Sequence, residues 1–237
     1  MTNNGGGCNI TVLLNNGVMQ KQTPPEIRIG ECRVKRDKET RNKLLASGKQ
    51  EFLEKGYMQA SLRSICKNTG VTTGALYFFF QDKEDLFAAI VEEPLSQLHQ
   101  IMCSHYASEM ENHGNGQVEG EDFSDDMETA ARIIHYLYSN YDEVQLLLIK
   151  AQGSRFEHCI DEFVDMTEKH YRVLADKMSE ASSRPRIDDY FIHWISHVTV
   201  NTFVHLITHE ESEEKALKHM KLTVKYLVDG WRGMFSS

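Results

Sequence analysis

The sequence has few of the features that mark a membrane protein, a disulfide-bonded scaffold or a disordered chain. Its 237 residues include only four prolines, and aromatic residues make up 9%. No apolar run approaches the roughly 20 residues that span a bilayer, and residues 10–14 are too short for a secretory signal and lack its basic lead-in. The five cysteines form no C-x-x-C pair, which indicates unpaired thiols in a reducing compartment. We therefore expect a cytoplasmic globular protein with no membrane partner.

Sequence motifs of the common enzyme classes are also missing. The chain has no P-loop, no G-x-G-x-x-G after a strand, no G-x-S-x-G elbow and no H-E-x-x-H helix. No set of nucleophile and base stands out either. We expect that the protein is not an enzyme and needs no cofactor.

The net charge of −9 is unevenly distributed along the chain. Residues 1–90 carry 13 Lys and Arg against 9 Asp and Glu, whereas residues 91–237 carry 13 against 26. A surface that faces phosphates needs local positive charge, and the acidic remainder would repel DNA and help to orient the molecule. An asymmetry of this size also arises by chance, so it decides little by itself.

Three segments can be distinguished by their composition. Residues 1–32 contain Gly-Gly-Gly, Asn-Asn-Gly and Pro-Pro runs and are interpreted as a flexible leader; Met19 is an alternative beginning of the protein. Residues 33–82 are interpreted as a small domain of three helices, over 40–55, 62–68 and 72–80, in which Gly56 ends the first helix and Ser61 caps the second. Residues 83–237 form the third segment.

Helical periodicity continues to the end of the chain, and no useful strand-like alternation is present. Six further helices are predicted, over residues 83–112, 124–140, 142–151, 155–181, 188–209 and 213–234. The first contains Pro94 as a possible kink, and the acidic stretch 119–128 is expected to be a solvated loop or helix start. The fold class is therefore all-α, with about nine helices.

Two short helices joined by a tight turn at Gly70, with a supporting helix before them, are the ingredients of a helix-turn-helix. The second helix must enter a DNA major groove, so it needs small or polar residues near its N-terminus. Thr72, Thr73, Gly74 and Ala75 meet this need.

The order of these residues resembles the DNA-binding domain of the tetracycline-repressor (TetR) family. The resemblance covers about residues 40–87, and rests on Thr40-Arg41, Phe52, Gly56-Tyr57, Ser61, Ile65, Gly70 to Phe80 and Lys83 to Leu86. It implies that Tyr77 and Lys83 contact phosphates, that Thr72 and Thr73 lie at the groove, and that residues 83–237 form the dimer and enclose an effector cavity. The phenylalanines at 78 and 79 depart from the family, which often has polar or histidine residues there.

The predicted DNA-binding residues are Arg41, Ser61, Thr72, Thr73, Gly74, Ala75, Tyr77, Phe78, Phe79 and Lys83. For Tyr77 the alternative is a place at the edge of the core, and for Lys83 an ordinary solvated lysine. One of the two phenylalanines is expected to pack inward, and the other is left open, because an exposed ring could meet a thymine methyl group. The basic arm Arg33, Lys35, Arg36, Lys38 and Arg41 could reach DNA or be a solvated tail.

The last two predicted helices carry apolar stripes with spacings of three and four, typical of helix–helix packing. The predicted dimer interface comprises Phe191, Trp194, Val198, Thr202, Leu217, Met220, Val224, Leu227 and Trp231. An intramolecular core is the alternative. A homodimer would have a function, because two recognition helices must reach successive major grooves about 34 Å apart.

Polar residues recur every four residues at His193, His197, Asn201, His205 and His209. Because each four-residue step rotates about 40° around an α-helix, the stripe wraps around the helix and cannot converge on one ion. No metal site is therefore predicted.

For the effector cavity, the residue types and helical positions suggest Met102, His135, Tyr138, Phe163, Met166 and His170. Core packing is the alternative for each of them.

We expect a transcriptional regulator that binds double-stranded operator DNA as a homodimer, typically a repressor that an unknown small-molecule effector releases. The alternative is an effector-independent DNA-binding protein that acts through a protein partner.

Overall fold

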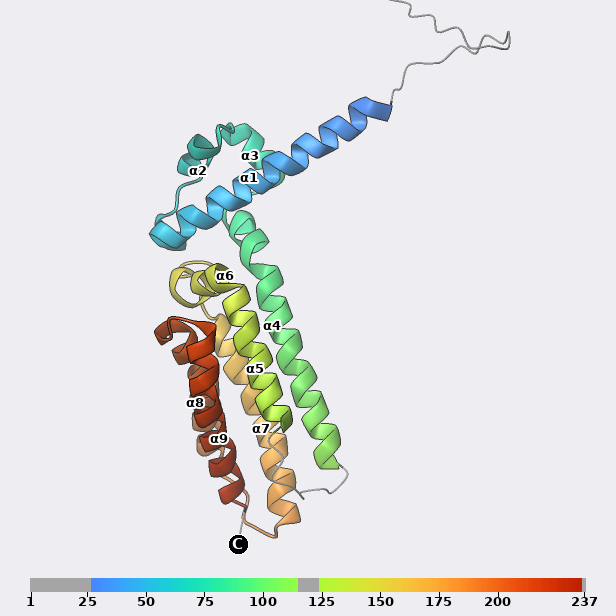
Figure 1. The fold of residues 1–237 in the computed structure, drawn as a ribbon, viewed down its shortest axis with the longest axis vertical. Helices are drawn as coiled ribbons and strands as arrows, with labels where there is room; N and C mark the ends of the chain where they lie inside the picture. Colours follow the sequence, from blue (N-terminus) through green and yellow to red (C-terminus); the bar gives the residue numbers. More distant parts are fainter. Residues whose placement is uncertain (1–26, 115–123, 236–237) are drawn as a thin grey trace, which may run out of the picture. The chain divides into compact units, whose positions relative to one another are not determined.

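The computed structural model describes residues 27–114 and 124–235, and every regular element in those ranges is helical. The elements are α1 (Ile27–Gln59), α2 (Leu62–Thr69), α3 (Thr73–Phe79), α4 (Lys83–Gly114), α5 (Ser124–Ser139), α6 (Tyr141–Gln145), a π-helix η1 (Leu146–Lys150), α7 (Cys159–Ala181), α8 (Asp189–His209) and α9 (Glu213–Gly233), as drawn in Figure 1. The chain divides into two compact units, residues 1–39 and 40–237. The all-α fold class is confirmed.

The first helix begins earlier than predicted. Residues 27–32 were expected to belong to the leader, but they are already helical, and the helix continues to Gln59. The last breakers before it are Pro24 and Pro25, and nothing after them stops a helix until Gly56, whose φ of 74° interrupts the regular conformation. The rest of the predicted leader, residues 1–26, lies outside the described residues.

A single cluster of buried side chains joins α1–α4 to η1 and α7 within residues 40–237. Phe52 of α1 meets Phe87 of α4 edge to face, with ring centroids 4.9 Å apart. Phe87 in turn lies beside Phe156, which precedes α7. The three N-terminal helices therefore share their core with the helices that follow.

The long helix α4 takes part in both regions. Its first turns carry Leu86, Phe87 and Val91 into the shared cluster. It then remains helical through Pro94. Further along, α4 packs against α5 and α7 (Figure 1).

The remaining helices pack in pairs, α5 against α9 and α7 against α8. The predicted helix 142–151 is a short α6 followed by the π-helical η1, and the predicted start of the next helix at 155 is wrong. Residues 151–158 form turns around Gly153, whose φ is 83°. None of the described helices is long and apolar enough to cross a membrane.

Candidate DNA-binding site and ligand cavity

Helices α2 and α3 are joined by a tight turn closed at Gly70. This glycine has a left-handed conformation (φ 68°), which it can adopt without steric cost. Past it, the Val71 amide donates to the carbonyl of Cys66 at 3.1 Å. Leu76 and Phe80, four residues apart, are buried and attach the second helix to the core.

The N-terminal tip of α3 faces solvent and is small. The Thr72 hydroxyl accepts a hydrogen bond from the Ala75 amide at 3.2 Å and so caps the helix. Thr72, Thr73 and Gly74 are exposed, Ala75 is half-buried, and a Cβ added at Gly74 would meet no atom within 4 Å. Nothing in the described residues blocks the approach of a second molecule to this tip.

The aromatic residues of α3 separate into two groups. Tyr77 and Phe78 are 57% and 72% exposed, whereas Phe79 is half-buried and packs against the core cluster. The core-edge alternative for Tyr77 therefore does not hold. Phe78 is the phenylalanine left open by the sequence, and it is the one that points outward.

Lys83 is half-buried and has partners within the chain. Its ammonium group donates to the carbonyl of Tyr57 at 2.7 Å and to that of Met58 at 3.2 Å, and lies 4.5 Å from the centroid of the Tyr57 ring. A cation placed on the last carbonyls of a helix stabilises that helix end. Lys83 thus joins α4 to the end of α1, a role that the sequence reading missed.

The two other predicted contact residues are exposed. The Arg41 guanidinium lies over the Phe80 ring, 5.3 Å from its centroid. Ser61 precedes α2, but its side chain makes no capping hydrogen bond; its amide instead donates to Glu51 at 3.1 Å.

Glu51 is a buried carboxylate that sequence reasoning missed. It accepts hydrogen bonds from Lys55, from the Ser61 amide and from the Ser64 hydroxyl. Burial alone would raise the pKa of Glu51, but these three donors outweigh burial and hold the pKa below its usual value. Glu51 thereby fixes the start of α2 to α1; the Glu51–Lys55 spacing of four residues was the only signal for it in the sequence.

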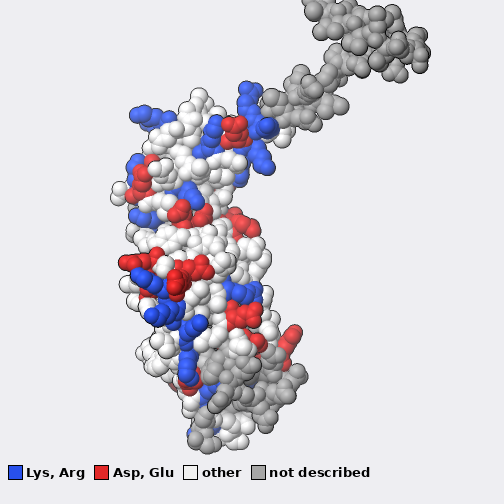
Figure 2. All heavy atoms as spheres, in the orientation of Figure 1, with Lys and Arg blue, Asp and Glu red and all other residues white. Residues whose placement is uncertain are grey.

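Basic side chains are present on the surface of the helix-turn-helix. Arg41, Lys43, Arg63 and Lys67 are all exposed. On the face drawn in Figure 2, Lys and Arg side chains are interspersed with Asp and Glu. In residues 27–39, Lys35, Arg36 and Lys38 are also exposed.

A cavity of about 160 Å³ lies among α4, α5, α6, η1, α7, α8 and α9. Its wall is mostly apolar, with polar side chains at one end. Met102 and Phe163 line it, as the sequence predicted.

The other four predicted cavity residues are placed elsewhere, and their assignment is corrected. His135 is exposed and contacts Glu213 at 2.9 Å, while the Tyr138 hydroxyl donates to the carbonyl of Glu210. Met166 packs against the core cluster. His170 is buried behind the wall, 2.7 Å from Glu109. Helices α5 and α7 each pack against several neighbours. The helical periodicity therefore indicated that these four residues face inward, but it did not indicate whether they face the cavity or another helix.

Some of the predicted dimer residues are buried within the chain, and others are exposed on its surface. Met220 and Val224 are buried within the chain among α5 and α8, Leu227 lines the cavity, and Trp231 lies against Tyr171. For these four, the intramolecular alternative describes the packing. The large apolar residues that do face outward on α8 and α9 are Tyr190, Trp194, Leu222 and Tyr226.

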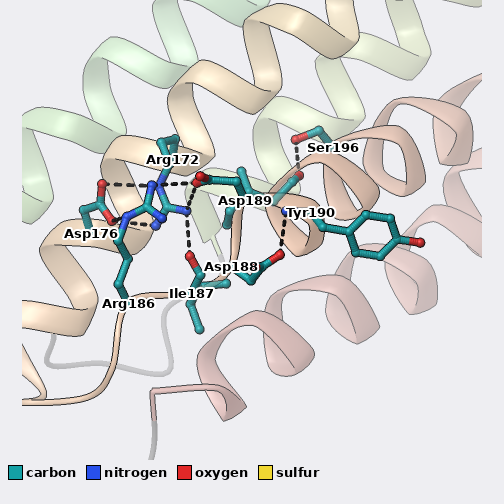
Figure 3. A network of polar contacts seen from close by, with 9 residues as sticks. Arg172, Asp176, Arg186, Ile187, Asp188, Asp189, Tyr190 and Ser196 are labelled. Carbon is teal, nitrogen blue, oxygen red and sulfur yellow. Dashed lines mark hydrogen bonds and ion pairs between the residues drawn. The ribbon is translucent and has the colours of Figure 1, made fainter.

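A network of charged groups fixes the start of α8 (Figure 3). Arg172 of α7 donates to the Ile187 carbonyl at 2.8 Å and to Asp189 at 3.0 Å, and Arg186 donates to the same aspartate at 2.6 Å. The hydrogen bond from Arg186 is the main reason that the pKa of Asp189 is lowered. Tyr190, one residue later, points away from this network (Figure 3).

The histidines of α8 form two neighbouring pairs, His193 with His197 and His205 with His209. Among the described residues, no group of three or more His, Cys, Asp or Glu side chains is arranged to hold a metal ion.

Comparisons with known proteins identify the N-terminal helices. Residues 44–90 match the family described as "Bacterial regulatory proteins, tetR family". The HTH-type transcriptional repressor BepR of Brucella suis biovar 1 is 47% identical over 53 residues, which are 22% of this chain and 25% of that protein. The HTH-type transcriptional regulator AcrR of Shigella flexneri is 38% identical over 69 residues, 29% of this chain and 32% of that protein. The chain thus matches between a quarter and a third of the length of these relatives.

Solved structures match over a larger part of the chain. A TetR family transcriptional regulator from Chloroflexus aurantiacus has a TM-score of 0.57 and 15% identity, over 81% of this chain and 93% of that one. NalD of Pseudomonas aeruginosa, the secondary repressor of the MexAB-OprM multidrug efflux pump, has a TM-score of 0.53 and 17% identity, over 81% and 96%. At these identities the likeness establishes the fold.

The described helices and the exposed α3 tip define an all-α protein with an N-terminal helix-turn-helix. Over residues 44–90, which include that helix-turn-helix, the chain is similar to the tetR family of bacterial regulatory proteins.

Proposed function

We propose that this protein is a transcriptional regulator that binds double-stranded operator DNA through α2 and α3. The observation that carries the proposal is the exposed, small-residue tip of α3, at Thr72 to Ala75, inside the segment that matches the tetR family. A helix with such a tip can approach base edges in the major groove, while its N-terminal amides attract phosphate. Tyr77 and Phe78 extend the contact surface, with a hydroxyl for a phosphate and a ring for a thymine methyl group.

The other predicted DNA contacts remain part of the proposal. Arg41 and Ser61 are exposed beside the helix-turn-helix and are suited to phosphates. The Lys83 ammonium group already donates hydrogen bonds to carbonyl oxygens of the chain, so only the donor capacity that these bonds leave is available to a phosphate. We therefore propose a second role for Lys83, which is to hold the end of α1 in place.

We propose that the active form is a homodimer that pairs through the outward faces of α8 and α9. Tyr190, Trp194, Leu222 and Tyr226 are large apolar side chains exposed on these two helices, and such a surface marks an interaction site. Of the residues predicted from sequence, Phe191, Trp194, Val198 and Thr202 remain partly or fully exposed and fit the same face. Leu217 is also partly exposed, but it packs against the cluster that α9 forms with α5 and α8.

The cavity supports release by a small-molecule effector in the cytoplasm. Its wall shares α4 with the core of the helix-turn-helix, because α4 contributes first to the shared core and then to the cavity wall. The dimer would have one state whose recognition helices are spaced to bind DNA and another state whose spacing does not fit DNA. An effector with higher affinity for the second state would shift the equilibrium toward it, by an amount set by the difference between its affinities for the two states. The second candidate, an effector-independent protein that acts through a partner, would leave the cavity without a use.

A charge placed on the α3 tip tests DNA binding directly. We expect Gly74→Glu to abolish binding to duplex DNA at low ionic strength, because the carboxylate would face phosphates, while the fold is kept because the added side chain points into open space. The matched control is Ala107→Glu, which adds the same charge at an exposed position of α4. Equal DNA affinity of the two variants, measured by fluorescence anisotropy, would remove α3 from the interface.

A further inference from the structure

The cavity has one polar end and a long apolar part. Its α4 wall runs from Leu95 to Tyr106 and its α5 wall from Asp126 to Leu137. At 1.5 Å per residue, each wall extends about 16 Å. Because α4 and α5 run in opposite directions (Figure 1), the polar residues near the end of the first wall lie beside those at the start of the second. A volume of about 160 Å³ spread over such a length fits a narrow, elongated molecule.

The two tyrosine hydroxyls at the polar end already have partners. Tyr106 shares a hydrogen bond with Thr167 at 2.8 Å, and Tyr171 shares one with Thr199 at 3.2 Å. These pairs fix the rings against the cavity and leave little donor capacity for a ligand.

Asp126, in contrast, brings a half-buried carboxylate to the wall. The Nε2 atom of His105 is 3.7 Å from its Oδ1 atom, which is too long for a hydrogen bond. Glu109 is a second acid close by; it is held by His170 at 2.7 Å and is 3.9 Å from His105. The polar end therefore brings two carboxylates, those of Asp126 and Glu109, close together.

Some of the charges around Asp126 raise the pKa of its carboxyl group and others lower it. Burial raises the pKa of Asp126, the repulsion from Glu109 and Asp125 adds to this effect, and attraction to His105 and Arg232 opposes it without cancelling it. An anionic ligand would place a further negative charge among these acids, whereas a cation would relieve the repulsion and supply the missing donors.

We propose that the cavity binds an elongated amphiphilic amine, with its hydrocarbon part along the apolar wall and its ammonium group against Asp126. Apolar burial would supply most of the affinity, and the charge-assisted hydrogen bond to Asp126 the preference for an amine. This inference rests on the proposed ligand-responsive function and specifies its ligand class.

Calorimetric titration of the full chain with three ligands of equal length tests the inference. The probes are n-decylamine, n-decanol and n-decanoate, kept below the concentrations at which they form micelles. We expect decylamine to bind at least about tenfold more tightly than decanoate. Asp126→Asn should reduce the decylamine affinity about tenfold and leave that for decanol unchanged, which also reports that the cavity is intact. Glu128→Gln, at an exposed position of the same helix, should change neither.

Two results would overturn the inference: decanoate binding as tightly as decylamine, or Asp126→Asn leaving the decylamine affinity unchanged. Duplex DNA binding by the same preparations separates this failure from that of the proposed function. A chain that binds DNA but not decylamine refutes the ligand class alone. A chain that binds decylamine through Asp126 but ignores DNA supports the ligand class and refutes the regulator.

Discussion

At the scale of single residues, Glu51 fixes the geometry of the helix-turn-helix. A buried carboxylate that accepts three hydrogen bonds is costly to replace, because its donors would lose a charged partner in a buried site. We expect Glu51→Gln to lower the free energy of unfolding at pH 7 by about 1–3 kcal/mol, measured by urea denaturation. Glu54→Gln, at an exposed position on the same helix, should stay within about 0.5 kcal/mol of the wild type.

The same residue predicts a dependence on pH. The pKa of Glu51 is lower in the folded chain than its ordinary value of 4.5. Its contribution to stability is therefore complete above pH 4.5 and is lost as the pH falls through the lower, folded-state pKa. The difference between wild type and Glu51→Gln should narrow in that acid range. A difference that stays constant from pH 7 into that range would contradict the assigned hydrogen bonds.

Tyr77 provides the second test at this scale. Tyr77→Phe removes only the exposed hydroxyl, so we expect DNA affinity to fall about tenfold on many sequences alike, as for a phosphate contact. The measurement is binding to several unrelated duplexes, with Tyr141→Phe, an exposed tyrosine of α6, as the control. A loss confined to one sequence would indicate a base contact instead.

Residue roles were only partly predictable from sequence. The α3 tip could be predicted, because small polar residues at a helix start are a local pattern. Glu51 and Lys83 could not, because their partners lie in other elements: Ser61 and Ser64 for the first, and the carbonyls of Tyr57 and Met58 for the second. Phe78 and Phe79 could be separated only once the packing of α3 was known.

At the scale of elements, α6 connects the helix-turn-helix to the cavity. Lys49 of α1 contacts Glu143 at 3.0 Å and Asp142 at 3.3 Å. The adjoining residues Val144 and Leu147 line the cavity. A change in the cavity can therefore reach α1 through α6, in addition to the path along α4.

Removal of this contact should weaken the coupling between the two sites. We expect Lys49→Met to reduce the effect of decylamine on DNA affinity by about 0.5–2 kcal/mol while both separate affinities stay close to the wild type. Lys215→Met, which breaks an ion pair with Glu211 at the start of α9, is the control. If the two variants show the same coupling as the wild type, α6 does not transmit the effect.

Helix positions followed largely from the sequence, because apolar periodicity and capping residues are local signals. The misplaced boundaries are at the start of α1 and around η1. Residues 27–32 are adjacent to Gly- and Pro-rich sequence that favoured a loop. The stretch after Gln145 has the apolar pattern of a regular helix, and nothing in that pattern distinguishes the π-helical geometry found there. Core and cavity residues have the same sequence pattern, so His135 and Tyr138 could not be distinguished from lining residues.

At the scale of the whole molecule, pairing determines whether two α3 helices reach one DNA site. The double substitution Leu222→Lys with Tyr226→Lys places like charges on a surface that would meet its own copy. We expect monomers in sedimentation velocity, and a fall in affinity for a two-half-site duplex. Val173→Lys, at an exposed apolar position of α7, should remain dimeric. A double variant that still dimerises would place the interface elsewhere.

The most direct test of the central claim is selection of bound duplexes from a random pool by the purified protein. We expect the recovered sites to share a two-fold symmetric sequence, with half-sites about 34 Å apart along the DNA, and to be lost with Gly74→Glu. A pool that shows no enrichment at low ionic strength would contradict the assignment of α3 as a DNA-recognition helix.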